Sequence, residues 1–156
     1  MKLDEFAKQV RIVSIDENQR LREKYINAFI DVNKQYYKKY IGILNRYSDG
    51  LCYTGYLWDC LKDVVVIDLQ YIELKSFEID NVFVFWDIHT EERIFIKDYW
   101  KFGKKSLLEL KFNILINNLE YFPEDIYIFD KSFKWTLVIT HEFMNGKRWC
   151  FKSGNI

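Results

Sequence analysis

Apolar side chains recur at steps of three and four over the first part of the chain. They are Leu21, Tyr25, Phe29, Val32, Tyr36, Tyr40, Leu44 and Tyr47. This spacing predicts a long amphipathic helix. Ser14 with Glu17 resembles a capping box that would begin it, Gly42 is a candidate bend, and Ser48-Asp49-Gly50 would end it. A second, short helix is expected from Tyr53 to Leu61.

Two apolar runs in the middle of the chain predict strands on either side of another helix. Val64 to Ile67 reads VVVI, and Val82 to Ile88 reads VFVFWDI. The second run is apolar without alternation, which is typical of a strand covered on both faces. Between the runs, a short helix is expected from Asp68 to about Glu78. HTEE would then turn the chain into a partner strand near Arg93 to Lys97.

A second capping pair, Ser106 with Glu109, introduces another apolar series at helical spacing. The series comprises Leu108, Phe112, Leu115 and Leu119. We therefore expect a helix that ends before Pro123.

The last third of the chain alternates apolar and polar positions, the period of a strand. Strands are expected at 126–129, 135–143 and 148–151, and Asn145-Gly146 is a strong signal for a hairpin turn. Within the middle strand, the period of two puts His141 on the face of Trp135, Leu137 and Ile139. A three-stranded antiparallel meander follows from this pattern.

Together these elements predict a single α+β domain spanning residues 1–156, with two or three helices packed on a mostly antiparallel sheet of five or six strands. Hydrophobic residues make up 49% of the chain and aromatic residues 19%, which excludes a disordered chain and indicates a core rich in rings.

Charge and cysteine content exclude several functional classes. Lys and Arg total 23 and Asp and Glu total 23, so no net field would attract nucleic acid or an acidic membrane. The start of the chain lacks an apolar signal segment, and no apolar run approaches the ~20 residues that span a bilayer, so a cytoplasmic protein is expected. The three cysteines, Cys52, Cys60 and Cys150, have no zinc or disulfide spacing. No glycine cluster indicates a phosphate loop, and no cofactor is expected.

The stretch GYLWDCLKD, from Gly55 to Asp63, contains the strongest candidate for a binding site. On a helix, Trp58 would lie at the flank between the buried and open faces, and Asp59 would point away from the core. An exposed Trp beside a carboxylate has the composition of a protein-binding hot spot. Tyr56 falls off the apolar stripe and is a further contact candidate, and Asp63 would be peripheral. The alternative is that Trp58 covers the core and Asp59 is a solvated helix charge.

A different set of residues raises the possibility of an enzyme. Asp87 and His89, with Glu91 and Glu92, follow a buried strand and offer oxygen and imidazole ligands for a metal, although their spacing matches no known ligand pattern. An ordinary polar hairpin turn is the preferred explanation of these residues. His141 with Glu142 does not form a base and its orienter, because neighbours on a strand point to opposite faces; His141 is expected to be a hydrogen-bonded core residue. Glu124-Asp125 is expected to be a turn or a small acidic spot.

The five residues LWDCL, from Leu57 to Leu61, resemble the contact helix of the barstar family of ribonuclease inhibitors. The resemblance implies that Asp59 takes the place of the principal acidic contact, that Trp58 lies beside it and that Cys60 is a packed thiol.

The wider chain, with VFVFWDIHTEERIFIKDYWKF and FPEDIYIFDKSFKWTLVITHEF, resembles small bacterial immunity proteins of the polymorphic or contact-dependent growth inhibition type. This resemblance implies a cognate toxin domain as protein partner and no reaction of its own. The sequence therefore predicts an immunity-type inhibitor that acts by stoichiometric binding through Tyr56, Trp58, Asp59 and Asp63. The alternatives are a small metal-dependent hydrolase centred on Asp87 and His89, and a domain that acts through oligomerisation.

Overall fold

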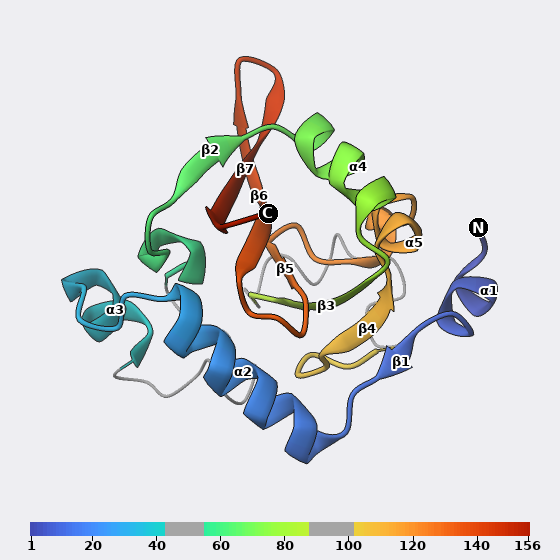
Figure 1. Ribbon diagram of the computed structural model, residues 1–156, viewed down its shortest axis with the longest axis horizontal. Helices are drawn as coiled ribbons and strands as arrows, with labels where there is room; N and C mark the ends of the chain where they lie inside the picture. Colours follow the sequence, from blue (N-terminus) through green and yellow to red (C-terminus); the bar gives the residue numbers. More distant parts are fainter. Residues whose placement is uncertain (43–54, 88–101) are drawn as a thin grey trace.

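A computed structural model describes residues 1–42, 55–87 and 102–156 (Figure 1). Its centre is one antiparallel sheet with the strand order β1-β4-β3-β5-β6-β7-β2. In chain order the strands are β1 (Arg11–Ile12), β2 (Val65–Ile67), β3 (Asn81–Trp86), β4 (Leu108–Lys111), β5 (Ile126–Phe129), β6 (Trp135–Met144) and β7 (Lys147–Gly154). The α+β class and the largely antiparallel sheet are confirmed.

Helices cover both faces of this sheet. They are α1 (Leu3–Ala7), α2 (Ile15–Phe29), α3 (Gln35–Tyr40), α4 (Leu69–Glu78) and α5 (Phe112–Ile116), with 3₁₀ turns η2 (Leu57–Cys60) and η5 (Leu119–Tyr121). Buried side chains of α1, α4 and α5 pack on what we call the α4 face, and those of α2 and η2 pack on the opposite α2 face. Among the described residues there are thus five α-helices and seven strands, more than the sequence predicted.

Strand β3 is covered on both faces, as its apolar run predicted. Val82, Val84 and Trp86 enter the core of the α4 face, and Phe83 and Phe85 enter that of the α2 face. The strand lies between β4 and β5, so both of its edges are paired.

The single long helix expected from Ser14 to Tyr47 is wrong. Its start is correct, because the Ser14 hydroxyl accepts a hydrogen bond from the Glu17 amide at 3.3 Å, but α2 ends at Phe29. There the backbone pairs with the end of η2: the Lys62 amide donates to the Phe29 carbonyl and the Asp31 amide to the Cys60 carbonyl, both at 2.8 Å. These long-range hydrogen bonds replace the next helical turn, and α3 begins separately.

The helix expected to begin at Ser106 is also wrong at its start. Leu108 and Leu110 alternate with Glu109 and Lys111, and this period of two prevails: the four residues form β4 and pair with β3. Both leucines enter the core of the α4 face. Only from Phe112 onward does the chain become helical, in the five residues of α5.

The C-terminal meander β5–β6–β7 is confirmed, including its hairpin turn. Asn145 and Gly146 have φ angles of 52° and 76°, the left-handed conformation of both central residues in a type I′ turn. The expected helix from Asp68 to Glu78 is also confirmed, and the Asp68 side chain caps it by accepting from the Tyr71 amide at 3.0 Å.

Several predictions fall outside the described residues. They are the partner strand near 93–97, the end of the first helix near residues 44–50, and the site residues His89, Glu91 and Glu92. Tyr53 also lies outside them, but the short helix expected from Tyr53 to Leu61 is wrong in its described part: Tyr56 and Leu61 are extended, and only Leu57–Cys60 form a 3₁₀ turn. In the part of the chain that the structure describes, no helix is long and apolar enough to span a membrane.

Candidate protein-binding site

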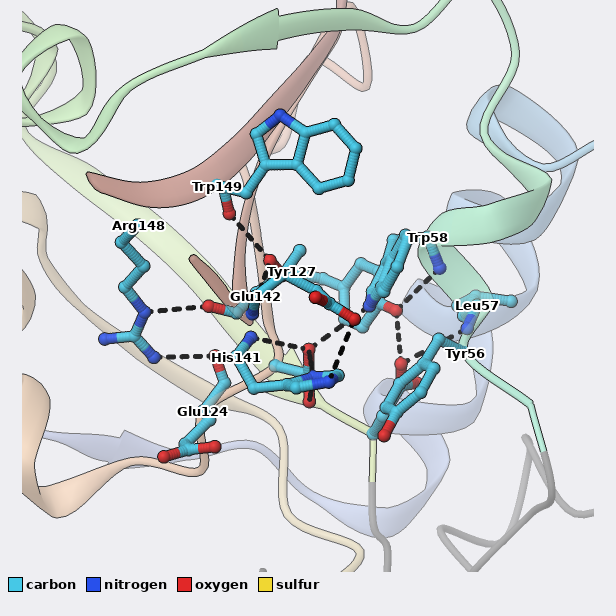
Figure 2. A network of polar contacts seen from close by, with 12 residues as sticks. Tyr56, Leu57, Trp58, Glu124, Tyr127, His141, Glu142, Arg148 and Trp149 are labelled. Atoms are coloured by element: carbon cyan, nitrogen blue, oxygen red, sulfur yellow. Dashed lines mark hydrogen bonds and ion pairs between the residues drawn. The ribbon is translucent and has the colours of Figure 1, made fainter. Parts of the chain in front are cut away.

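Two buried polar side chains hold the η2 segment on the sheet (Figure 2). The carboxylate of Asp87, at the end of β3, accepts a hydrogen bond from the Leu57 amide at 3.2 Å. The Tyr127 hydroxyl on β5 donates to the same carboxylate and accepts from the Trp58 amide at 2.8 Å. Both Asp87 and Tyr127 are fully buried, so these hydrogen bonds are shielded from water and fix the start of η2.

A second buried carboxylate, Asp125, connects η2 to strand β6. Its Oδ1 atom accepts from the Trp58 indole at 3.2 Å and from the His141 amide at 3.1 Å. The Nδ1 atom of His141 lies 3.0 Å from both Asp125 oxygens. Because Asp125 has no exposed surface, its oxygens take their hydrogen-bond donors from within the fold, and it sets the orientation of both rings.

These contacts assemble a row of rings that we call the aromatic belt: Tyr56, Trp58, His141 and Trp149. The Tyr56 ring lies 5.3 Å from Trp58 at an interplanar angle of 21°, and 4.8 Å from His141. Phe151, buried beneath, lies 5.4 Å from both Trp58 and Trp149 and joins them. All four belt residues are half-buried, so each ring packs on the fold and keeps part of its surface open.

A bulge in β6 brings His141 into the belt. The register of β6 with β7 shifts between Ile139 and Phe143. As a result, His141 packs on Tyr56 and Trp58 on the α2 face and not beside Ile139, so the predicted face is wrong, although the predicted hydrogen bond exists. The Arg148 guanidinium stabilises the bulge by donating to the Thr140 and Glu124 carbonyls at 2.8 and 2.9 Å.

Asp59 lies next to the belt and is half-buried, not fully solvated as its helical position predicted. Tyr36 of α3 lies against it: the hydroxyl hydrogen-bonds with the carboxylate, and the Lys34 ammonium donates to the Asp59 carbonyl at 2.5 Å. Burial raises the pKa of Asp59, the Tyr36 hydrogen bond and Lys34 oppose this shift, and the charge of Glu142 adds to it. Burial also raises the pKa of the Cys60 thiol to about 12, as expected for a packed cysteine.

Glu142 and Asp63 differ in their relation to the belt. Glu142 is exposed beside it, with a carboxylate oxygen 3.4 Å from His141 Nε2. Asp63 is exposed and has a φ of 46°. It borders a separate hollow with Phe29 and Phe133. Of the four residues predicted to bind a partner, the structure therefore brings Tyr56, Trp58 and Asp59 together and leaves Asp63 apart.

The hydrolase alternative gains no support at Asp87. That carboxylate is buried and engaged by the Leu57 amide and the Tyr127 hydroxyl. Within residues 1–42, 55–87 and 102–156, no group of three or more His, Cys, Asp or Glu side chains is arranged to hold a metal ion. His89 lies outside these ranges.

Sequence reasoning missed the residues that build the site. Asp125 was expected in a turn or a small acidic spot, and Tyr127 was only part of a strand. A local signal exists for Asp125, because a carboxylate directly before four fully apolar or aromatic strand residues must either leave the core or find donors there. Its actual donors, Trp58 and His141, are distant in sequence and cannot be read from spacing.

Comparisons with protein-family models, with curated proteins and with solved structures give no match for this chain. The resemblance of LWDCL to the barstar helix thus rests on the sequence alone.

Proposed function

We propose that this protein is an immunity-type inhibitor that neutralises a bacterial toxin, a nuclease or another toxin domain, by stoichiometric binding in the cytoplasm. The observation that carries the proposal is the aromatic belt: half-buried rings held in place by buried carboxylates, with Asp59 and Glu142 at their side. Tyr56, Trp58 and Asp59 are the central contacts, and Asp63 is peripheral.

The belt has the physical properties of a binding surface. Tyr and Trp are enriched among residues that dominate binding free energy, because large rings exclude water from neighbouring polar contacts. Trp58 is fixed by its amide, its indole nitrogen and its contacts with Tyr56 and Phe151. A ring that is already fixed loses little conformational entropy when a partner binds, so more of the contact energy appears as affinity.

The charges beside the belt favour a basic partner. Asp59 and Glu142 lie close enough for the charge of Glu142 to raise the pKa of Asp59. A partner's Arg or Lys would relieve the repulsion between the two carboxylates while forming charge-assisted hydrogen bonds. Toxins that cleave nucleic acids use such cations to hold phosphate, so a carboxylate at this position would imitate the substrate. Charge complementarity would also accelerate association.

Growth protection tests the proposal. The proposal predicts that the gene directly upstream encodes a large secreted protein, and the C-terminal domain of that protein is the toxin candidate. We expect that expression of this domain alone stops growth and that co-expression with the chain restores it. Purified together, the two proteins should form a complex of one copy each by size-exclusion chromatography with light scattering.

A matched pair of variants connects protection to the belt. Trp58→Ala removes a belt ring, whereas Phe77→Ala removes a ring that is 82% exposed on α4, on the opposite face. Protection should be lost with the first variant and kept with the second. An upstream domain that stops growth but neither binds the native chain nor is neutralised by it would contradict the proposal.

A further inference from the structure

A groove of about 570 Å³ lies between the tip of the β6–β7 hairpin, the end of β2 and the start of α4. Its walls come from both sides of the sheet. Trp149 packs on the α2 face, and Tyr71 packs on the α4 face. Because residues of both faces line the groove, it lies at an edge of the sheet, beside the first residues of β7.

The groove lies where the beginning of β7 has no neighbouring strand on its β2 side, within the part of the chain that the structure describes. β2 pairs with β7 only from Val65–Lys152 to Ile67–Cys150, whereas β7 begins at Lys147. Among the described residues, the segment from Lys147 to Trp149 therefore has a strand partner on its β6 side only. Met144 and Lys147 close the two-residue turn and direct their hydrogen bonds toward each other, so the next residue, Arg148, points its N–H and C=O away from β6. The C=O accepts a long hydrogen bond from the Cys150 thiol at 3.8 Å, so the N–H is the group offered to an added strand.

We infer that this groove binds an extended segment of the partner protein, which adds a strand beside Lys147–Trp149 in line with β2. Exposed sheet edges recognise peptides in this way, with the backbone supplying affinity and side-chain pockets supplying selectivity. Val66 and Met144, which are 55% and 47% exposed, offer apolar surface to such a segment. The inference rests on the proposed function, because the occupant is a segment of the same toxin.

The charged side chains around the groove favour an acidic segment of the partner protein. Lys147 and Arg148 line the groove. Lys152 lies close to it, with its ammonium group 5.6 Å from the centre of the Tyr71 ring, whereas Lys75 beside the same ring is paired with Glu78 at 2.7 Å and adds no net charge. The one carboxylate in the lining, Asp68, is engaged as the cap of α4. The excess of cations complements a segment that carries Asp or Glu among apolar residues.

The groove is continuous with the aromatic belt. Trp149 belongs to the belt through Phe151 and also lines the groove. One partner can therefore place a basic side chain beside Asp59 and Glu142 and an acidic extended segment beside Arg148. Two sites of opposite charge on one surface would also fix the orientation of the partner.

Amide hydrogen exchange by NMR, with the upstream toxin domain as the probe, distinguishes this arrangement from others. We expect the Arg148 amide to exchange at least about tenfold more slowly in the complex, because it gains a hydrogen bond. Val66 is the internal control. Cys150 and Lys152 point their backbone groups toward β2, as Arg148 does, and bond to Ile67 and Val65; Val66, opposite Phe151, forms the pair without hydrogen bonds, so its N–H points to the outer edge of β2. Slowed exchange at Val66 without slowing at Arg148 would place the partner on the wrong edge and overturn the inference.

Two matched variants complete the test. Val66→Asp places a charge in the groove, whereas Val64→Asp makes the same change at a residue that is 47% exposed and outside the groove lining. We expect the Kd for the toxin domain to rise more than about tenfold for the first variant and less than about twofold for the second.

The outcomes separate the two proposals. If the toxin domain does not bind the native chain, both fail. If it binds and Trp58→Ala weakens the complex while Arg148 exchange and the Val66→Asp affinity stay unchanged, only the added strand is wrong. If Arg148 becomes protected with rising concentration of this chain alone, the occupant is a second copy, and the assignment to the toxin is overturned.

Discussion

The two faces of strand β6 show how one sheet separates stability from recognition. On the α4 face, Leu137 and Ile139 pack with Cys150 in a core built from apolar and aromatic side chains. On the α2 face, the neighbouring residues contact a polar network: Thr136 bonds to Tyr25 at 2.8 Å, and His141 bonds to Asp125. Helices pack on both faces, and the α2 face also carries the half-buried rings of the belt.

This difference has an energetic meaning. Burial of apolar side chains is favourable in nearly any arrangement that fills the space. Burial of a carboxylate is favourable only when every acceptor has a donor, so the network around Asp87 and Asp125 permits few geometries. Apolar burial on both faces therefore supplies the free energy of folding, and the polar network on the α2 face offsets part of it while fixing the rings of the belt.

The largest expected effect tests the apolar face. Leu137→Ala leaves a cavity in a fully buried core and should lower the free energy of unfolding by about 2–5 kcal/mol. Urea denaturation measures the loss. The folded fraction should bind the toxin domain with unchanged affinity, and a matching loss of affinity would show that the two faces are not separable.

A smaller effect is expected in the polar network. Asp125→Asn keeps the size of the side chain but weakens an acceptor shared by Trp58 and His141, and should cost about 1–3 kcal/mol in urea denaturation. Asp130→Asn is the matched control, because Asp130 also accepts from an indole, that of Trp135 at 3.1 Å. Asp130 is only half-buried, so water can replace the lost interaction and the cost should stay below about 1 kcal/mol. Equal costs would contradict the importance of burial in this network.

The smallest effect has the opposite sign. The pKa of Asp59 is raised in the folded protein, so its ionisation costs stability as the pH rises from the ordinary value of 3.8 through the folded pKa. Asp59→Asn removes that cost, and at pH 7 it should stabilise the protein by less than about 1 kcal/mol, because water screens this half-exposed group. At pH 3 the difference should vanish. Toxin binding should weaken at the same time, since the charge is lost. The measured quantity is the free energy of unfolding of Asp59→Asn minus that of the native chain. A lower value of this difference at pH 7 than at pH 3 would refute this account.

The sequence predicted the elements whose signals are local. The hairpin turn at Asn145-Gly146, the apolar run of β3 and the cap of α4 at Asp68 depend on neighbouring residues, and all three are confirmed. Two helices were wrong for a common reason. At Phe29 and at Leu108 a long-range strand contact competed with a helical pattern and prevailed. Such competition is decided by partners distant in the chain, and a periodicity count does not include them.

The candidate site also depends on contacts that are distant in sequence. Trp58 was expected at the margin of the core and lies there half-buried, but the expected helix is a 3₁₀ turn, and Tyr127 and Asp125 hold the residue in place. Asp59 was expected to face solvent, yet Tyr36 from another helix covers part of it. The bulge that moves His141 to the belt is a third case, since a change of register reverses the face of every residue beyond it.

The most direct test of the central claim, that the aromatic belt binds a protein partner, is the calorimetric Kd of the upstream toxin domain for three proteins: the native chain, Trp58→Ala and Phe77→Ala. Circular dichroism first establishes that each is folded. The account predicts that Trp58→Ala loses at least about 2 kcal/mol of binding free energy, roughly thirtyfold in Kd, while Phe77→Ala changes it by less than about 0.5 kcal/mol. Equal affinities for all three folded proteins would contradict it.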